Sequence, residues 1–374
     1  MIKVLHVAEG ARFAGIESHL VTMFSRLRGR EDLHAELAVF AEGLLKEKTQ
    51  AIGVSVHTIS RRRKYDTRAI AYAARLIREG GFHLVHTHGY LANIIGGKAA
   101  MKAGVPFVTT VHGAAEPFHG WAGWKMRFNL ALDRRMTRRH CARVITVAEP
   151  LKRQLMAAGM PKEKIDVIHN GLEEVVVDEA VRQAARATWH LTPEDRVVTF
   201  VGRLEVVKDP LLFVETAAQI AARVPRAVFR VAGDGPLLDA ARARAKVLNL
   251  GESIRFLGFV DDVPSLVAAS DLLLLTSRHE GIPNAALEAM RAGVALLAPA
   301  VGGLPELLKG LPQLLCHTRE AQDLALRAAN WLSHDEERVS LGQAGKHRFE
   351  TAFTAATMVE KTVQVYRRVV ENEP

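Results

Sequence analysis

Residues 271–290 are DLLLLTSRHEGIPNAALEAM, and they combine a short leucine-rich run, a turn and a helical segment. A short apolar run followed by turn residues predicts a buried strand, and strand–turn–helix units build α/β domains. The helix begins without a good cap. Pro283 suits its first position, which makes Ile282 the capping residue, and isoleucine offers no oxygen to the free backbone amides. Either water or a bound ligand must satisfy those amides.

The same alternation of apolar strands and helical segments runs along the whole chain. Strands are predicted at residues 2–8, 34–41, 54–59, 84–89, 106–113, 143–149 and 164–171, and again at 196–203, 227–233, 253–259, 271–277 and 294–300. Such alternation predicts parallel sheets covered by helices, in which ligands bind beyond the carboxyl ends of the strands. A chain of 374 residues is too long for one hydrophobic core.

We therefore predict an α/β protein with two Rossmann-like, doubly wound parallel-sheet domains facing a central cleft. A charged helical segment and the polar turn LTPED separate the two series of strands. The first domain is placed at residues 1–185 and the second at 190–354. A last helix, in residues 355–374, is expected to pack back on the first domain.

Composition restricts the cellular setting and the partners. No run of eighteen apolar residues occurs, the first residues lack a signal-peptide cleavage site, and there are only two cysteines, Cys141 and Cys316. These features predict a reduced, cytoplasmic protein without a membrane span or a cysteine-based metal site. Residues 1–190 carry 29 Lys and Arg against 18 Asp and Glu, and the remainder carries 21 against 23. The first half is therefore the basic one, and an anionic partner or an unengaged solvated surface would each explain it.

Polar residues follow the predicted strands of the second half, where a ligand would bind. Arg203 and Lys208 lie in one loop, and two cations there suit a diphosphate. Gly233 and Gly235 allow either a close backbone approach or a tight turn. Asp262, with Asp261 before it, is better explained as a helix N-cap ahead of Pro264 than as a metal ligand.

The turn at residues 279–284 follows a strand of the same sheet, so it lies at the same edge as the loop of Arg203 and Lys208. Helix amides and the helix dipole favour anions, and phosphate oxygens can replace the missing cap. Glu288, about one turn into the helix, would then lie beside the ligand, where a carboxylate can accept hydrogen bonds from sugar hydroxyls. Glu280, before the turn, would reach another part of the ligand.

Taken together, these motifs resemble the donor site of glycosyltransferase family 4. The resemblance rests on HEGIPNAALEAM, VGRLEVVKD, AGDGP, FLGFVDD and VGGLPE, and it extends through FAGIESHL, HTHG, TVHG and VIHNG in the first half. It covers nearly the whole chain. The resemblance implies a GT-B fold and a retaining, metal-independent enzyme that uses a nucleotide-diphosphate sugar as donor.

The family's residue roles transfer to the matching positions. Glu288 is similar to the ribose-binding glutamate, Glu280 to the carboxylate near the transferred sugar, and His112 to the active-site histidine. Val260 resembles a position whose backbone contacts the base, and Gly15 part of the loop that approaches the phosphates. The implied catalytic set is His112, Glu280, Arg203 and Lys208. The implied donor-binding set is Gly15, Arg203, Lys208, Gly233, Val260, Gly281, Ile282, Pro283, Asn284, Leu287 and Glu288.

Four histidines, His86, His88, His112 and His169, end predicted strands. Their spacings match no zinc-binding pattern, so we expect no metal site and no cofactor. His86 and His88 are interpreted either as acceptor-site residues or as loop packing.

The expected function is transfer of a sugar to an acceptor hydroxyl, with a lipid-linked or saccharide acceptor in cell-envelope synthesis. Alternatives are another GT-B enzyme such as an epimerase or a phosphorylase, a glycosidase using Glu280 and Glu288, and a non-catalytic nucleotide-sugar binding module. No nucleic acid partner is expected. In the predicted helix 121–140, aromatic residues and arginines suit either the inner face of an anionic membrane or simple packing on the sheet.

Overall fold

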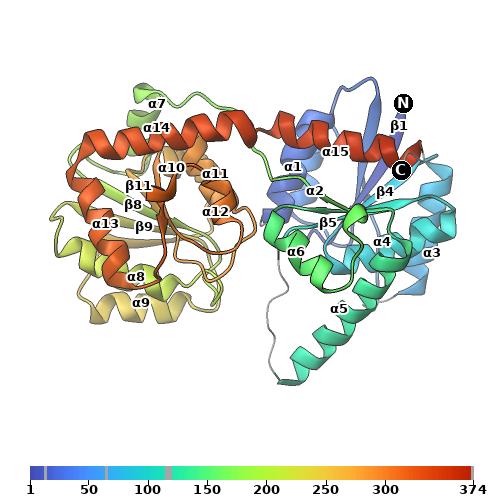
Figure 1. The fold of residues 1–374 in the computed structure, drawn as a ribbon, viewed down its shortest axis with the longest axis horizontal. Coiled ribbons are helices and arrows are strands. Elements are labelled where there is room, and N and C mark those ends of the chain that lie inside the picture. The colour runs from blue at the N-terminus through green and yellow to red at the C-terminus, as the bar shows by residue number, and fades with distance from the viewer. Residues whose placement is uncertain (12–14, 64–65, 114–119, 372–374) are drawn as a thin grey trace. The chain divides into compact units, whose positions relative to one another are not determined.

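The computed structural model describes residues 1–11, 15–63, 66–113 and 120–371, with the side chains of residues 120–128 left out. The chain forms two compact units. The N-terminal unit consists of residues 1–173 and 355–374, and the C-terminal unit of residues 174–354. In each unit a parallel sheet lies between helices (Figure 1). The predicted fold class, two doubly wound α/β domains, is confirmed.

The sheet of the N-terminal unit has the order β3-β2-β1-β4-β5-β6-β7, with every neighbouring pair parallel. Its strands are β1 (Ile2–Ala8), β2 (Leu33–Val39), β3 (Val56–Thr58), β4 (Leu84–His88), β5 (Phe107–Val111), β6 (Arg143–Thr146) and β7 (Ile165–Val167). Its helices are α1 (Gly15–Leu27), α2 (Leu44–Ala51), α3 (Thr67–Glu79), α4 (Tyr90–Ala103), α5 (Gly120–His140), α6 (Glu149–Ala157), the 3₁₀ turn η1 (Lys162–Lys164) and α15 (Ala355–Val370).

The sheet of the C-terminal unit has the order β10-β9-β8-β11-β12-β13 and is also parallel. Its strands are β8 (Arg196–Val201), β9 (Ala227–Ala232), β10 (Ile254–Gly258), β11 (Leu272–Leu274), β12 (Ala295–Pro299) and β13 (Leu315–Cys316). Its helices are α7 (Glu179–Thr188), α8 (Pro210–Ala221), α9 (Leu238–Val247), α10 (Val263–Ala268), α11 (Asn284–Arg291), α12 (Leu304–Leu307), α13 (Ala321–Ser333) and α14 (Asp335–Ala352), with the 3₁₀ turns η2 (Gly251–Ser253) and η3 (Pro312–Leu314).

The first boundary between the units lies earlier than the predicted residue 185, because helix α7 belongs to the C-terminal unit. The buried carboxylate of Asp271 explains this placement. It pairs with Arg182 at 2.7 Å and with Arg186 at 3.4 Å, and both arginines come from α7. Asp271 also accepts a hydrogen bond from the backbone N–H of Val197 at the start of β8. A charge buried in this way needs its partners, so α7 is tied to the second sheet.

The last helix, α15, packs in the N-terminal unit. Met358, Val359 and Val363 are buried in a cluster with Val4 of β1 and Val108 of β5, and the ring of Tyr366 is fully buried there as well. Figure 1 shows α15, in red, close to α1. The final helix therefore completes one face of the first sheet.

In each unit the chain starts at a central strand and adds strands first on one side and then on the other. The change of direction lies between β1 and β4 in the first sheet and between β8 and β11 in the second. The loops that follow these strands separate at this point and leave room for a ligand. Functional side chains are consequently expected at the carboxyl ends of the strands at these two switch points.

The predicted aromatic and basic stripe of α5 falls largely on undescribed side chains. Trp121, Trp124 and Phe128 lie outside the described set, whereas Leu132 packs against the buried core of the unit. Among the helices that the structure describes, none combines the length and apolar character needed to cross a bilayer.

Helix α14 approaches α11 and β12 closely at Gly342, which provides a test of the packing. A Cβ added at Gly342 would lie 2.0 Å from the backbone oxygen of Gly293, while a Cβ at Gly345 would make ordinary contacts with Met290, 3.6 Å from its Cγ and 3.9 Å from its Cα. Gly342→Ala should therefore destabilise the protein by about 2 kcal/mol through overpacking. Gly345→Ala should be neutral or stabilising by up to about 1 kcal/mol, because alanine favours a helix. Thermal unfolding of both variants is the measurement, and equal melting temperatures would contradict the close approach.

Candidate active site

The loops after β8 and β11 meet at the switch point of the second sheet. The Lys208 ammonium lies 2.6 Å from Oε1 of Glu280, and the Ser277 hydroxyl donates to the same carboxylate oxygen at 2.5 Å. The Glu280 side chain is only 7% exposed and that of Lys208 is 24% exposed. A cation and a carboxylate predicted from separate motifs are thus brought into direct contact, with the cation on the more open side.

The loop that carries Lys208 is fixed by Asp209, a residue that sequence analysis did not single out. Asp209 has a left-handed backbone (φ 52°) and caps α8 through its carboxylate. The same carboxylate pairs with Arg278 at 2.8 Å and Arg319 at 2.5 Å. The hydroxyl of Thr276 donates to the carbonyl oxygens of Lys208 and Asp209. The Asp-Pro pair that opens α8 was the available sequence signal, since Asp and Pro favour the first positions of a helix.

Gly233 and Gly302 lie in close contact with the backbone of neighbouring loops. A Cβ at Gly233 would lie 1.9 Å from the carbonyl oxygen of Gly202, and one at Gly302 would lie 1.9 Å from that of Glu280. Both positions also have positive φ, 136° and 57°. Gly233 therefore packs closely against the protein's own loop after β8, and its close approach to a ligand stays a prediction.

Helix α11 begins one residue later than predicted. Its N-cap is Pro283 and not Ile282, because Pro283 keeps an extended backbone (φ −75°, ψ 131°) and the first helical residue is Asn284. No side chain caps the helix. Ile282 and Leu287 are buried, at 3% and 0% exposure, so their side chains belong to the core and only their backbone could contact a ligand. Gly281, which precedes Ile282, is half-buried.

Glu288 lies on α11 and forms an ion pair with Arg291, one turn further along the helix. Burial raises the pKa of Glu288, while the neighbouring Arg291 acts in the opposite direction. The carboxylate is therefore held in place by a cation, with a side chain that is 13% exposed.

Further predicted donor residues of the C-terminal unit lie in the loops after β8 and β10. Arg203 is in the same loop as Lys208, is about half exposed and forms an ion pair with Glu205. Val260 is half-buried in the loop after β10. Asp262 caps α10 by accepting a hydrogen bond from the Ser265 N–H at 3.0 Å, as predicted.

The predicted residues of the N-terminal unit lie beyond the carboxyl ends of strands of the first sheet. Gly15 is the first residue of α1, and a Cβ added there would meet none of the described atoms within 4 Å. His112 follows β5 and is half-buried. His169, also named from the sequence, follows β7 and is half-buried as well.

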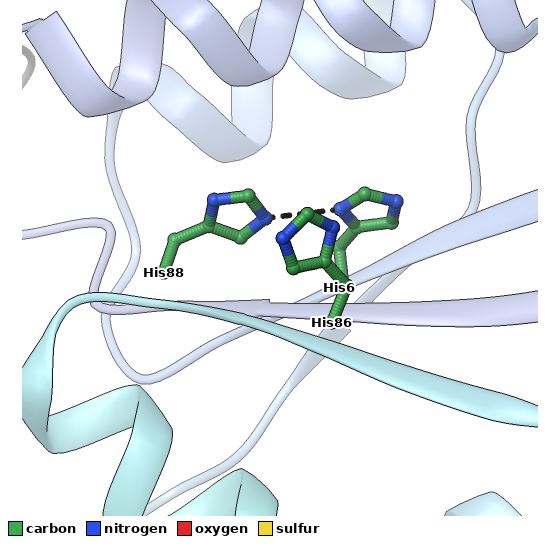
Figure 2. Close-up of side chains that lie close together, drawn as sticks. All are labelled: His6, His86 and His88. Carbon is green, nitrogen blue, oxygen red and sulfur yellow. Dashed lines mark hydrogen bonds between the residues drawn. The ribbon is translucent and has the colours of Figure 1, made fainter. Parts of the chain in front are cut away.

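His112 is part of a group of five histidines. His6 comes from β1, His86 and His88 from β4, and His19 from α1. Figure 2 shows the rings of His6, His86 and His88 gathered together, with the 3.1 Å hydrogen bond from His6 Nδ1 to His88 Nε2 dashed. The His19 ring meets the His112 ring edge-on, with centroids 4.8 Å apart. Sequence analysis did not single out His6, which lies in an apolar strand, or His19, although His19 falls within the motif FAGIESHL.

The histidine group is electrically neutral near physiological pH. Burial lowers the pKa of His6 to about 3 and that of His19 to about 4. Burial likewise holds the pKa values of His86, His88 and His112 well below 6.5, and the neighbouring histidines add to the effect. Each imidazole therefore carries a single ring proton.

Neutral imidazoles are also metal ligands, and two groups of three among the described residues have suitable spacing. They are His6, His86 and His88, and His19, His88 and His112, with ligand nitrogens within 4.8 Å of one another in each group. Spacing along the sequence did not reveal these groups because their members come from separate strands and a helix.

Comparisons with known proteins agree with this architecture. A family model described as "Glycosyltransferase Family 4" matches residues 4–174, and one described as "Glycosyl transferases group 1" matches residues 181–348. D-inositol 3-phosphate glycosyltransferase of Rhodococcus opacus is 29% identical over 327 residues, which cover 79% of this chain and 71% of that protein.

Two further relatives are informative. The UDP-Gal:alpha-D-GlcNAc-diphosphoundecaprenol alpha-1,3-galactosyltransferase of Escherichia coli is 27% identical over 318 residues, covering 82% of this chain and 81% of that protein. The crystal structure of Anabaena Alr3699/HepE in complex with UDP and glucose matches with a TM-score of 0.86 at 21% identity, covering 98% of this chain and 99% of that one. With both sheets, the loops at their switch points and both family models in agreement, the chain belongs to glycosyltransferase family 4 and is a glycosyltransferase with the two-domain GT-B fold.

Proposed function

We propose that this protein is a retaining, metal-independent glycosyltransferase that moves a hexosyl group from a nucleotide-diphosphate sugar to an acceptor hydroxyl, in the synthesis of cell-envelope glycolipids or polysaccharides. The observation that carries the proposal is the contact between Lys208 and Glu280 at the switch point of the second sheet. A ligand that enters there meets a cation, a carboxylate and the uncapped start of α11 together.

The charge distribution suits a diphosphate leaving group. Negative charge grows on the diphosphate as the bond to the sugar breaks, and preorganised cations and amides stabilise that charge in the transition state. Lys208 and Arg203 supply the cations, and the N-terminal end of α11 adds the positive end of its helix dipole. Because these groups provide the positive charge that a divalent cation would otherwise provide, the transfer needs no metal ion.

The other predicted residues complete the proposed donor site. Glu288 binds the ribose hydroxyls, the backbone at Val260 contacts the base, and Glu280 acts on the transferred sugar. In the N-terminal unit, resemblance gives Gly15 a role toward the phosphates and His112 a role toward the sugar. These roles are supported by resemblance at matching positions and by the burial of Glu280 and Glu288, which keeps both carboxylates in defined orientations.

The acceptor is proposed to be lipid-linked or a saccharide. The Escherichia coli relative is named for transfer to a sugar on diphosphoundecaprenol, and the Rhodococcus relative for a sugar transfer involving inositol 3-phosphate. Exposed arginines at the end of α5, which are Arg134, Arg135, Arg138 and Arg139, support weak binding of the N-terminal unit to an anionic membrane surface. In the cytoplasm that surface is the inner face of the membrane.

The diphosphate role is tested with Lys208→Met, which keeps the apolar stem and removes the ammonium group. Loss of one transition-state charge contact costs about 3 kcal/mol, so turnover should fall about a hundredfold. Lys246→Ala, at an exposed position on α9, is the control and should keep normal turnover. Steady-state sugar transfer from a nucleotide sugar is the assay. Normal turnover in folded Lys208→Met protein would remove the diphosphate assignment.

The ribose role is tested with Glu288→Gln, which keeps the shape of the side chain but weakens its acceptance of hydrogen bonds. Removing a charged acceptor from two hydroxyls should weaken nucleotide binding about tenfold. Titration calorimetry with the free nucleotide measures this effect. Glu252→Gln, an exposed position in η2, is the control. Unchanged affinity in Glu288→Gln protein would show that this carboxylate does not bind the ribose.

The membrane role is tested by replacing Arg134, Arg135, Arg138 and Arg139 with Gln. Each basic residue near an anionic surface contributes about 1 kcal/mol, so cosedimentation with anionic liposomes at low salt should be lost. The matched control replaces four exposed arginines of the C-terminal unit, which are Arg223, Arg226, Arg242 and Arg255. Nucleotide-sugar binding should persist in both variants. A wild-type protein that ignores anionic liposomes even at low salt has no such membrane contact.

A further inference from the structure

The buried histidines form a continuous chain of hydrogen bonds that ends at His112. His112 Nε2 lies 3.2 Å from His88 Nδ1, and His88 Nε2 lies 3.1 Å from His6 Nδ1. His6 Nε2 in turn lies 3.4 Å from the Tyr366 hydroxyl. The three imidazoles are therefore joined end to end, from the half-buried His112 to the core.

The chain continues beyond Tyr366. The Tyr366 hydroxyl lies 2.5 Å from His86 Nδ1, and His86 Nε2 lies 2.7 Å from the Thr110 hydroxyl. Tyr366, His86 and Thr110 are all at most 2% exposed. Five hydrogen bonds thus connect six side chains, and of these six only His112 is not fully buried.

Neutral imidazoles make such a chain directional. Each neutral ring has one N–H donor and one bare nitrogen that accepts, so a ring that accepts on one side must donate on the other. Tyr366 has one hydroxyl proton and can donate to only one of its two histidines. If it donated to neither, a buried hydroxyl proton would be left without an acceptor, at considerable cost. All five bonds therefore point the same way, either toward His112 or away from it.

Thr110 decides between the two directions. Its hydroxyl has His86 as its single hydrogen-bond partner in the part of the chain that the structure describes. If His86 donated to it, the Thr110 proton would be buried without an acceptor. If Thr110 donates to His86 Nε2, every other donor of the hydrogen-bond chain is paired, and the one N–H of the chain that remains is on His112 Nδ1. The direction toward His112 is consequently the stable one.

We propose that His6, His86, His88 and Tyr366 are positioning residues that hold His112 with its proton on Nδ1, so that this imidazole presents a hydrogen-bond donor to an oxygen of the sugar substrate. The substrate part of this inference rests on the proposed function. His88 acts directly, by donating from its Nδ1 to His112 Nε2. His6, Tyr366 and His86 act through His88 by fixing its tautomer.

The same bonds argue against a metal ion in this cluster. Both ring nitrogens of His6, His86 and His88 are engaged by protein partners. A bound metal ion would require bare nitrogens, so it would have to break several of these bonds and leave protons unpaired.

The first test reads the tautomers directly. Protein labelled with ¹⁵N-histidine is studied at pH 8 by two-bond ¹H–¹⁵N correlation, with assignments from single His→Gln variants. His6, His86, His88 and His112 should all carry the proton on Nδ1. His83 is an internal reference with the opposite tautomer, because its Nδ1 accepts a hydrogen bond from the backbone N–H of Lys3. A proton on Nε2 of His112 or His88 would overturn the proposal, whether or not the protein transfers sugar.

The second test separates donation from packing by comparing two variants of nearly equal shape. His88→Asn retains an N–H group near the position of Nδ1. His88→Leu removes this group, and its apolar side chain is better suited than Asn to a buried position. The donor role predicts that kcat falls about tenfold in His88→Leu, the loss equivalent to one hydrogen bond, and by less in His88→Asn. The KM for the donor sugar should change less than kcat in both variants.

A purely structural role predicts the reverse order, with His88→Leu equal to or better than His88→Asn, and that result would overturn the proposal. The metal content of the purified protein is measured on the same samples. Stoichiometric zinc bound through these rings would also overturn it, because the nitrogens would then be ligands. Absence of any sugar transfer by the wild-type protein would refute the proposed function, while the tautomer spectrum would still decide the hydrogen-bond chain.

Discussion

The loops that carry Lys208 and Glu280 are each supported by a close backbone contact that only glycine allows. Gly233 touches the carbonyl of Gly202, and Gly302 touches the carbonyl of Glu280, each at a distance that excludes a Cβ. The second contact is continued by the N–H of Gly303, which donates to the Glu280 carbonyl at 3.1 Å. These backbone contacts add to the side-chain contacts of Asp209 and Thr276 in fixing where the two loops lie.

The two switch points have opposite electrostatic character. The second sheet presents the paired charges of Lys208 and Glu280, while the first presents imidazoles that burial keeps neutral. A charged pair suits a ligand whose charge increases during the reaction, since fixed charges stabilise developing charge. Neutral N–H donors suit uncharged hydroxyl groups. Burying an ion instead would not strengthen the recognition of such hydroxyls.

The sequence predicted features governed by local pattern and missed those set by tertiary contacts. Apolar runs located most strands of both sheets because buried parallel strands are mostly apolar. The charged segment at 173–189 was expected to be helical over its length, but the helix begins only at Glu179, after the Asp178 cap. The two-residue strand β13 was missed, since its length provides no periodicity. The left-handed backbone of Asp209 has no signature of its own, because the surrounding ion pairs impose it.

The return of the last helix to the first sheet has a chemical consequence as well as a structural one. Tyr366 comes from α15, and its hydroxyl bonds His6 of the first strand and His86 of the fourth. Without it, two buried imidazoles would each lose a partner, at a cost comparable to a lost hydrogen bond for each. A shell of apolar residues would have stabilised this core at least as well. We therefore explain the hydrogen-bonded chain by a role of its free end, which is His112. The C-terminal helix therefore contributes to the tautomer of a residue about 250 positions earlier in the sequence.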